Sequence, residues 1–393
     1  LWADAEFERY DPTVAGSREA LRRALSQERG SGQGQPIALF DIQPRPFQQD
    51  LLDQLEAERA LSRHRLLLVA ATGTGKTVIA ALDYRQRVRR QGGRYPRLLF
   101  VAHRGEILQQ ALATYRTVLR DPGFGDVLAG GREPAAWDHL FTTIDSLDSR
   151  DLLSRFGVDY WHSVVVDECH HMAAARFERF CSRVQAQELL GLTATPERAD
   201  GKPIAGFFDN RPDGRAAAEL RLWHALDLQL LVPFEYFGCD DGTDLAGVPW
   251  GKAGELPALR QALEANGARA QLVMREWERL AGRSRMRRAL AFCVSIEHAE
   301  FMARAFGEAG LKAACITSKT PPEERERAPH RLRDGGDLQV LVTVDLYNEG
   351  IDLPFVDTLL LLRPTQSPVV FQQQLGRGLR LNPPHKDLSL IHI

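Results

Sequence analysis

The sequence of 393 residues has few cysteines, no excess of either charge and no long apolar run. Its five cysteines are scattered and form no C-x-x-C pair, so they predict no zinc or iron–sulfur site and fit a reducing, cytoplasmic location. Because the net charge is only -2, a surface for nucleic acid has to be a local basic patch. Apolar runs such as 66–71 are far shorter than the ~20 residues of a membrane helix, so no membrane span is predicted.

The rest of the composition, 44% hydrophobic and 26% charged, is typical of a globular protein of two or three domains. Two stretches of the chain alternate short apolar runs with amphipathic segments, a pattern that predicts parallel sheets with helices on both faces. In the first stretch we expect strands at 66–70, 97–102, 140–142, 163–167 and 188–192 and helices at 78–90 and 105–119. In the second we expect strands at 231–238, 288–294, 313–316, 339–344 and 358–362 and helices at 257–280 and 296–308.

Shifts in composition divide the chain into four segments. We expect a helical remnant and linker at 1–36, a first α/β domain at 37–205 and a second, truncated α/β domain at 206–387. The tail 388–393 (LSLIHI) resembles the translation of a transposase adapter used in sequencing libraries. Two interpretations of it stay open, a non-native end of a truncated reading frame and a short apolar strand. Since the chain also starts with leucine, we expect it to be part of a longer protein.

A glycine-rich loop lies between the predicted strand 66–70 and the helix that follows. Its backbone N–H groups can wrap a phosphate chain, and the helix N-terminus adds partial positive charge. Lys76 is expected to hold the β- and γ-phosphates of ATP, and the Thr77 hydroxyl to hold Mg²⁺. Ala70 stands where the G-x-x-x-x-G-K-T pattern has its first glycine. The predicted nucleotide-binding residues of the loop are Thr72, Gly73, Thr74, Gly75, Lys76 and Thr77.

An acidic box, Asp-Glu-Cys-His at 167–170, closes the predicted strand 163–167. A carboxylate at a strand tip can reach a metal held by the loop of a neighbouring strand, so Asp167 is expected to hold Mg²⁺ through water. Glu168 would orient or deprotonate the attacking water. His170 and His171 could be metal ligands, although a hydrogen bond within the box is the simpler interpretation.

With these two motifs the chain resembles the superfamily-2 DExH-type helicases, in the group of XPB-like and restriction-type motors, over residues 44–382. The resemblance implies two tandem RecA-like domains with ATP hydrolysed in the cleft between them. Gln48 resembles the glutamine that contacts adenine, since a carboxamide can pair with both a donor and an acceptor of a base edge. Segments 102–104 and 142–147 resemble motifs that contact nucleic-acid phosphates, which implies such contacts for Arg104 and Thr142.

Further segments extend the resemblance into the second half. The segment 192–196 (LTATP) resembles the motif that links the ATP state to the grip on the strand, and 292–295 resembles motif IV. The segment 343–354 resembles motif V, which implies that Thr343 contacts a nucleic-acid phosphate and that Gly350 and Asp352 lie near the nucleotide.

The run 373–380 matches the pattern Q-x-x-G-R-x-x-R, which begins at Gln373. Two arginines three residues apart lie on one face of a helix, so Arg377 and Arg380 can both point into an interdomain cleft. By the resemblance, one or both act as arginine fingers on the γ-phosphate. The predicted catalytic residues are Lys76, Asp167, Glu168, Gln373, Arg377 and Arg380.

The resemblance implies an ATP-dependent DNA helicase or translocase with ATP and Mg²⁺ as cofactors. The implied setting is DNA repair, restriction or phage defence, with a nuclease or other effector domain outside this chain. An RNA helicase, a P-loop ATPase that regulates without moving, and a catalytically silent scaffold are the alternatives. A regulator would need neither the second lobe nor the run 373–380, and a scaffold would not need to keep Lys76, Glu168 and Arg377.

Overall fold

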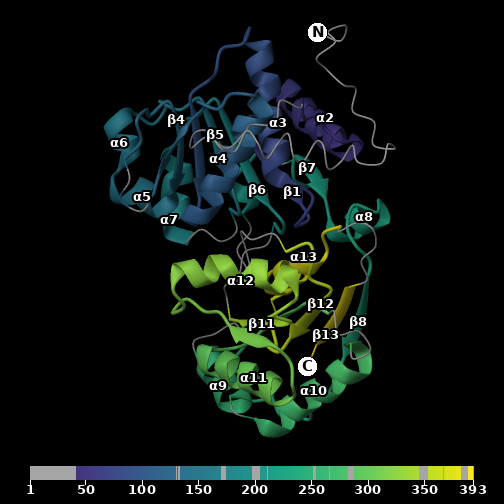
Figure 1. Cartoon of the computed structure of the whole chain (residues 1–393). Coiled ribbons are helices and arrows are strands. Elements are labelled where there is room, and N and C mark those ends of the chain that lie inside the picture. Colours follow the sequence, from purple (N-terminus) through teal and green to yellow (C-terminus); the bar gives the residue numbers. More distant parts are fainter. Residues whose placement is uncertain are drawn as a thin grey trace, which may run out of the picture.

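The protein folds into two lobes, each with its own β-sheet (Figure 1). The computed structural model describes residues 41–129, 131, 133–169, 174–196, 204–209, 211–250, 254–264, 266–281, 287–344, 353–365, 367–381 and 388–392. The predicted N-terminal remnant, His170, His171, Gly350 and Asp352 lie outside these residues. In the described part of the chain, no helix is both long and apolar enough to cross a membrane.

The first lobe is built on a seven-stranded sheet with the order β3-β4-β2-β5-β6-β1-β7, and every pair is parallel. This confirms the parallel sheet that the alternating pattern predicts. The strands are β1 (Arg65–Ala70), β2 (Leu98–Ala102), β3 (Asp126–Leu128), β4 (His139–Thr143), β5 (Ser163–Val166), β6 (Glu188–Thr193) and β7 (Ala218–Leu220).

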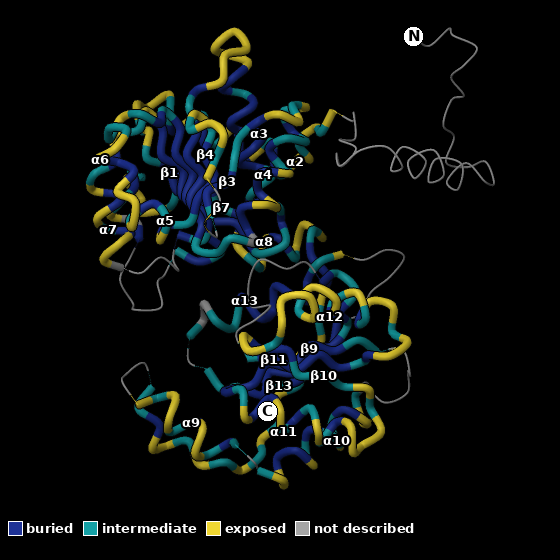
Figure 2. The backbone as a smooth tube through the Cα atoms, turned by 60° about the vertical axis from the view of Figure 1, so that its left-hand side comes forward, coloured by how far each residue is buried: buried dark blue, intermediate teal, exposed yellow. Residues whose placement is uncertain are grey.

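Helices cover both faces of this sheet because successive strand residues point to opposite sides. Leu66 and Leu68 pack with α2, α3 and α4, whereas Leu67 and Val69 pack with α5, α6 and α7. Figure 2 shows the strands as a buried layer between these helices. The helices are α2 (Pro46–Ala60), α3 (Lys76–Arg90), α4 (Gly105–Leu119), α5 (Ile144–Ser149), α6 (Leu152–Phe156), α7 (Ala174–Arg183) and the 3₁₀ turn η2 (Ala205–Phe207).

The second lobe has a six-stranded parallel sheet with the order β10-β11-β9-β12-β13-β8. Its faces are covered by α12 and α13 on one side and by α10 and α11 on the other. The strands are β8 (Phe234–Gly238), β9 (Ala289–Phe292), β10 (Ala313–Cys315), β11 (Val340–Thr343), β12 (Thr358–Leu361) and β13 (Leu388–His392). The helices are α9 (Glu255–Leu263), α10 (Gly267–Ala281), α11 (Ile296–Glu308), α12 (Pro322–Asp334) and α13 (Pro368–Gly378).

Two details differ from the sequence-based expectations, and a third agrees with one of the two open interpretations of the tail, the short apolar strand. The helix expected at 257–280 is two helices, α9, which ends at Leu263, and α10, which begins at Gly267. β7 lies beyond the expected domain limit at 205, yet it pairs with β1 in the first sheet, and α8 (Leu222–Asp227) follows it. We therefore propose to extend the first lobe at least to Leu220. The tail residues 388–392 form β13, a buried strand between β12 and β8.

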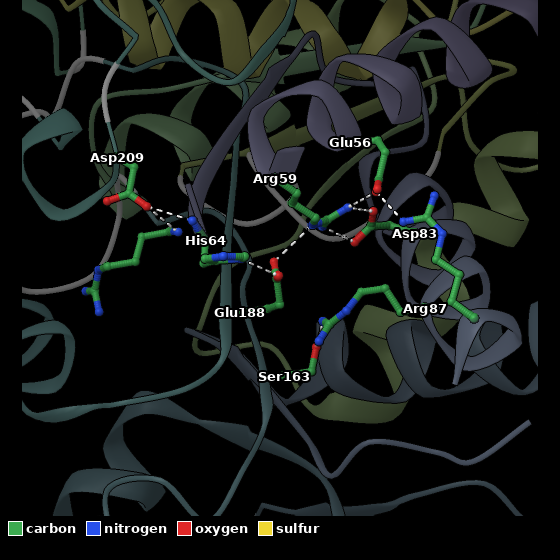
Figure 3. A network of polar contacts seen from close by, with 10 residues as sticks. Glu56, Arg59, His64, Asp83, Arg87, Ser163, Glu188 and Asp209 are labelled. Atoms are coloured by element: carbon green, nitrogen blue, oxygen red, sulfur yellow. Dashed lines mark hydrogen bonds and ion pairs between the residues drawn. The ribbon is translucent and has the colours of Figure 1, made fainter. Parts of the chain in front are cut away.

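A network of buried charges fastens α2 and α3 to the first sheet (Figure 3). The Arg59 guanidinium donates to both carboxylate oxygens of Asp83 at 2.7 and 2.8 Å and to Glu188 at 3.0 Å. Burial alone lowers the pKa of Arg59, but the two carboxylates outweigh burial and raise it above its usual value. Glu188 also contacts Nδ1 of His64 at 2.8 Å. These contacts link Glu188, the first residue of β6, to α2 and α3 at the end of the sheet where the parallel strands begin.

Candidate active site and nucleic-acid cleft

The glycine-rich loop connects β1 to α3 and turns on two glycines with left-handed backbone angles. Gly73 has φ 93° and Gly75 has φ 86°, a region that residues with a Cβ rarely adopt. The Thr74 hydroxyl donates to the Ala71 carbonyl at 2.7 Å, which closes the loop on itself. Lys76 and Thr77 begin α3, so its N-terminal N–H groups face the space in front of the loop.

Ala70 does not disturb the loop. It is the last residue of β1, fully buried, and its backbone does not have a positive φ. The next residue, Ala71, donates its N–H to Leu220 of β7 at 2.9 Å. Since the turn depends on Gly73 and Gly75 and not on residue 70, alanine replaces the first glycine of the pattern without strain.

The acidic box follows β5, two strands away from β1 in the sheet. Asp167 is buried, and its carboxylate accepts the N–H of Glu168 at 3.0 Å. Glu168 has φ 46°, an uncommon angle for a residue with a side chain, which turns the chain sharply at the strand end. The Glu168 carboxylate lies 3.3 Å from Nζ of Lys76. Burial raises the pKa of the neighbouring Cys169 thiol well above its usual value, which favours the neutral thiol.

One cavity joins the loop, the acidic box and two arginines, Arg377 of α13 and Arg380, which follows the end of that helix. The expectation of one helix that carries both arginines is therefore corrected, although both reach the cavity. The cavity is lined by residues of both lobes. Arg377, which is buried, and Arg380 form its second-lobe wall opposite Lys76 and Glu168. The full lining is Thr72, Gly73, Gly75, Lys76, Thr77, Val78, Ile107, Gln110, Ala111, Thr114, Asp167, Glu168, Arg377 and Arg380.

Gly376 allows this approach of the two lobes. A Cβ at this position would lie 2.6 Å from Cβ of Thr72, closer than real Cβ atoms come to their neighbours. On the other side of the loop, a Cβ at Gly73 would lie 3.2 Å from Cγ of Arg380. The N–H of Val232 donates to the Leu379 carbonyl at 2.7 Å and adds a backbone link to the end of α13. The glycine of Q-x-x-G-R-x-x-R is thus a contact point between the lobes.

Three further predicted residues lie beside the cavity or inside the loop. Gln48 is buried on α2, its carboxamide oxygen accepts the Arg45 N–H at 3.0 Å, and a Cβ at Gly75 would lie 3.4 Å from its Nε2. Gln48 therefore lies beside the phosphate loop. Thr74 stabilises the loop from within. Gln373 is buried on α13, one turn before Arg377, and is not part of the cavity lining.

The sequence analysis missed the wall that α4 contributes. Ile107, Gln110, Ala111 and Thr114 line the cavity. Their spacing of three, four and seven residues places them on one face of a helix. That periodicity is visible in the sequence, but the direction of the face is known only from the sheet order.

A second cleft between the lobes is rich in arginine. Arg104 and Gly105 line it from the first lobe, where Arg104 precedes the first turn of α4. The second lobe contributes Arg260, Arg325 and Arg363. Its remaining lining residues are apolar or carry hydroxyl groups: Leu256, Val294, Ser295, Ile296, Thr317, Ser318 and Val344. Four guanidinium groups, with no carboxylate among the described lining residues, form a surface suited to phosphates.

Of the three residues expected to contact nucleic acid, only Arg104 lines this cleft. Thr142 is fully buried, and its hydroxyl donates to the Leu128 carbonyl at 3.1 Å, so its side chain holds the sheet together. The adjacent Thr143 is the N-cap of α5 and accepts the Ser146 N–H at 3.1 Å. Thr343 is also fully buried, at the end of β11. The side chains of Thr142 and Thr343 are therefore not at a surface in this structure, which corrects the expectation of direct phosphate contacts.

The oxygen donors at the cavity suit a small hard cation. The Thr77 hydroxyl and the Asp167 carboxylate reach the same cavity from neighbouring parts of the sheet. Mg²⁺ prefers such oxygen ligands and keeps several waters, so one or two protein groups are sufficient. In the described residues there is no group of three or more His, Cys, Asp or Glu that could form a larger metal site.

Two family models match the two lobes separately. Residues 41–198 match the model described as "Type III restriction enzyme, res subunit", and residues 272–382 match the "Helicase conserved C-terminal domain". The chain belongs to the superfamily-2 helicases. The two matches cover the phosphate loop, the acidic box, Arg377 and Arg380, and this helicase chain has the expected tandem RecA-like architecture.

Curated relatives of this helicase chain include motors and restriction subunits. The yeast protein named "Putative ATP-dependent helicase IRC3" (Saccharomyces cerevisiae) is 25% identical over 86% of this chain and 49% of its own length. The protein named "Putative DNA 3'-5' helicase Rad25" of Halobacterium salinarum is 29% identical over 84% of this chain and 51% of its own length. The EcoAI type I restriction endonuclease subunit of Escherichia coli is 23% identical over 86% of this chain and 44% of its own. The chain spans about half the length of these relatives.

Solved structures share the fold. A fragment of an HsdR subunit of a type I restriction enzyme from Vibrio vulnificus aligns with a TM-score of 0.65 and 23% identity, covering 96% of this chain and 69% of the other. The Type ISP restriction-modification enzyme LlaBIII, determined bound to DNA, aligns with a TM-score of 0.64 and 17% identity over 90% of this chain and 28% of its own. At these identities the comparison supports the two-lobe fold.

Proposed function

We propose that the chain is the motor of a DNA helicase or translocase that hydrolyses ATP between its two lobes. The observation that carries this proposal is the single cavity lined by Lys76 and Glu168 from the first lobe and Arg377 and Arg380 from the second. A P-loop regulator without a second lobe would lack the two arginines that the second lobe contributes to this cavity.

Each residue has a role that follows from its place. Lys76 and the N–H groups at the start of α3 bind the β- and γ-phosphates. Thr77 and Asp167 hold Mg²⁺, which neutralises phosphate charge when bound. Glu168 accepts a proton from the attacking water, and its 3.3 Å distance to Lys76 places it beside the phosphates that Lys76 binds.

The second lobe completes the reaction. Arg377 and Arg380 stabilise the charge that develops on the transferred phosphoryl group. Because they come from the other lobe, ATP links the lobes before hydrolysis and releases them afterwards. The arginine-rich cleft between the same lobes would bind the nucleic-acid backbone and change its grip as they move.

DNA is the proposed track because Rad25 is named a DNA helicase and LlaBIII was determined with DNA bound. The restriction-enzyme relatives support a restriction or phage-defence setting with an effector domain outside this chain. DNA repair is the other setting that the resemblance implies. We place the protein in the cytoplasm on the strength of its free cysteines, while the Schizosaccharomyces pombe relative is named mitochondrial.

The test is ATP hydrolysis by the purified chain with no nucleic acid, single-stranded DNA, duplex DNA and RNA. We expect DNA to raise the rate, and Lys76→Ala to abolish hydrolysis because the phosphates lose their cation. Hydrolysis by Lys76→Ala at the parent rate would refute the site. If only RNA raises the rate of hydrolysis, the protein is an RNA helicase. If no nucleic acid raises the rate, a regulatory P-loop ATPase is favoured.

A further inference from the structure

One stripe of α9 is buried along one edge and borders the arginine-rich cleft along the other. Leu259 and Leu263, four residues apart, are fully buried and pack with Val248 and Val294 in a small core separate from the main ones. Leu256 and Arg260, also four residues apart, lie beside them on the helix surface and line the cleft. The helix is therefore attached to the second lobe by the two leucines, and the adjoining pair faces the cleft.

A hydrogen bond joins the C-terminal end of α9 to the connection between β9 and α11. Glu264, just after α9, accepts a hydrogen bond from the Ser295 hydroxyl. The same Ser295 oxygen accepts the His298 N–H at 3.0 Å and so caps α11. Because Val294 and Ser295 also line the cleft, α9 is held in a fixed position beside the other cleft residues.

The exposed pair on α9, Leu256 and Arg260, combines an apolar and a basic side chain in a cleft that is otherwise rich in arginine. Leu256 retains 39% of its surface exposed, although leucine gains from burial. Arg260 has a side chain that is 45% exposed; it lies 3.8 Å from Glu264, a weak pair, and its charge also acts on Glu297 in the first turn of α11. A ligand for this face has to offer both an anion and an apolar surface. A nucleic-acid strand offers both, as phosphates and as the faces of bases and sugars.

We propose that α9 is a nucleic-acid contact element in which Arg260 pairs with a backbone phosphate and Leu256 packs against an unpaired base of the same strand. The proposal rests on the proposed function and goes beyond the motifs that the sequence contains. An unpaired strand is the favoured ligand because its base faces are exposed, whereas those of a duplex are stacked inside.

The experiment measures binding of a fluorescent single-stranded oligonucleotide and of the matching duplex by anisotropy at several salt concentrations. Arg260→Ala should weaken binding and lower the slope of log K against log salt by about 0.7, the value for one phosphate contact on a single strand. Leu256→Ala should weaken single-strand binding by about threefold to tenfold with the slope unchanged, and should change duplex binding much less.

Two variants serve as references. Gln261→Ala changes an exposed residue of α9 that does not line the cleft, and it should bind like the parent. Arg104→Ala changes the first-lobe side of the cleft and should weaken binding if the cleft binds nucleic acid at all.

The outcomes separate the two proposals. If the parent binds no nucleic acid, the proposed function fails. If Arg104→Ala weakens binding while Leu256→Ala and Arg260→Ala match Gln261→Ala, the cleft stands and the assignment of α9 is overturned. Equal losses by Leu256→Ala on single strand and duplex would overturn the contact with an unpaired base.

Discussion

At the scale of single residues, Gly376 is where the second lobe touches the phosphate loop. A Cβ there would lie 2.6 Å from Cβ and 2.8 Å from Cγ2 of Thr72, and these atoms belong to the loop that binds phosphate. We predict that Gly376→Ala displaces α13 together with Arg377 and lowers ATP turnover by at least about tenfold, since small displacements of catalytic groups have large effects on rate.

The matched control for Gly376→Ala is Gly307→Ala. Gly307 lies in α11, and a Cβ there would meet no atom within 4 Å. This control should keep full turnover and gain slight stability from the better helix former. Steady-state ATPase assays compare the two variants. Equal turnover of Gly376→Ala and the parent would show that the close approach at Thr72 does not position the arginines.

At the scale of elements, the network around Arg59 determines how α2 and α3 are attached to the sheet. Arg59 has a side chain 9% exposed and bonds two carboxylates that are themselves largely buried. Arg59→Ala would leave Asp83 and Glu188 buried without their cation. We predict a loss of about 3–5 kcal/mol in the free energy of unfolding, the usual effect of breaking a buried ion pair.

Arg90→Ala provides the comparison for this prediction. Arg90 contacts Glu56 in the same network, but its side chain is 53% exposed. Surface pairs of this kind contribute about 0–1 kcal/mol. Urea unfolding at neutral pH measures both variants. Similar losses for Arg59→Ala and Arg90→Ala would contradict a role for Arg59 in fastening the helices.

Most elements could be predicted because their signals are local. The strands that flank the loop and the acidic box are continuous apolar runs, and α11 follows a clear periodic pattern. β3 and β7 have three residues each and one of the three is acidic, so neither forms an apolar run, and only pairing with distant strands makes them strands. The break between α9 and α10 was signalled by the pair Asn266-Gly267, a turn sequence inside an apolar periodic region.

The chemistry of the site was more predictable than its surroundings. Lys76, Asp167 and Arg377 belong to short motifs whose residue types follow from phosphate chemistry, and the structure places them around one cavity. The burial of Thr142 and the wall formed by α4 depend on how the sheet orders its strands. Sequence patterns give the face of a helix but not its neighbour.

At the scale of the whole molecule, the ATP site is complete only when both lobes are in place. The first lobe holds Lys76 and the acidic box, and the second supplies Arg377. We predict that Arg377→Ala keeps the affinity for an ATP analogue within about threefold but lowers kcat by about 10³-fold, as expected for an arginine that acts on the transition state. Arg327→Ala, an exposed arginine of α12 whose side chain is 77% exposed, is the control and should match the parent.

The same variant tests whether the two clefts act together. Both are lined by both lobes, so ATP and nucleic acid should each tighten the binding of the other by the same factor, because coupling between two sites is reciprocal. In Arg377→Ala the ATP analogue loses one of the two second-lobe arginines that line its cavity, and this factor should fall towards one even though each ligand still binds alone. Analogue titrations with and without oligonucleotide measure the factor in one direction, and oligonucleotide titrations with and without analogue measure it in the other. A coupling factor that is unchanged in Arg377→Ala would mean that the lobes communicate through another contact, such as the one between Gly376 and Thr72.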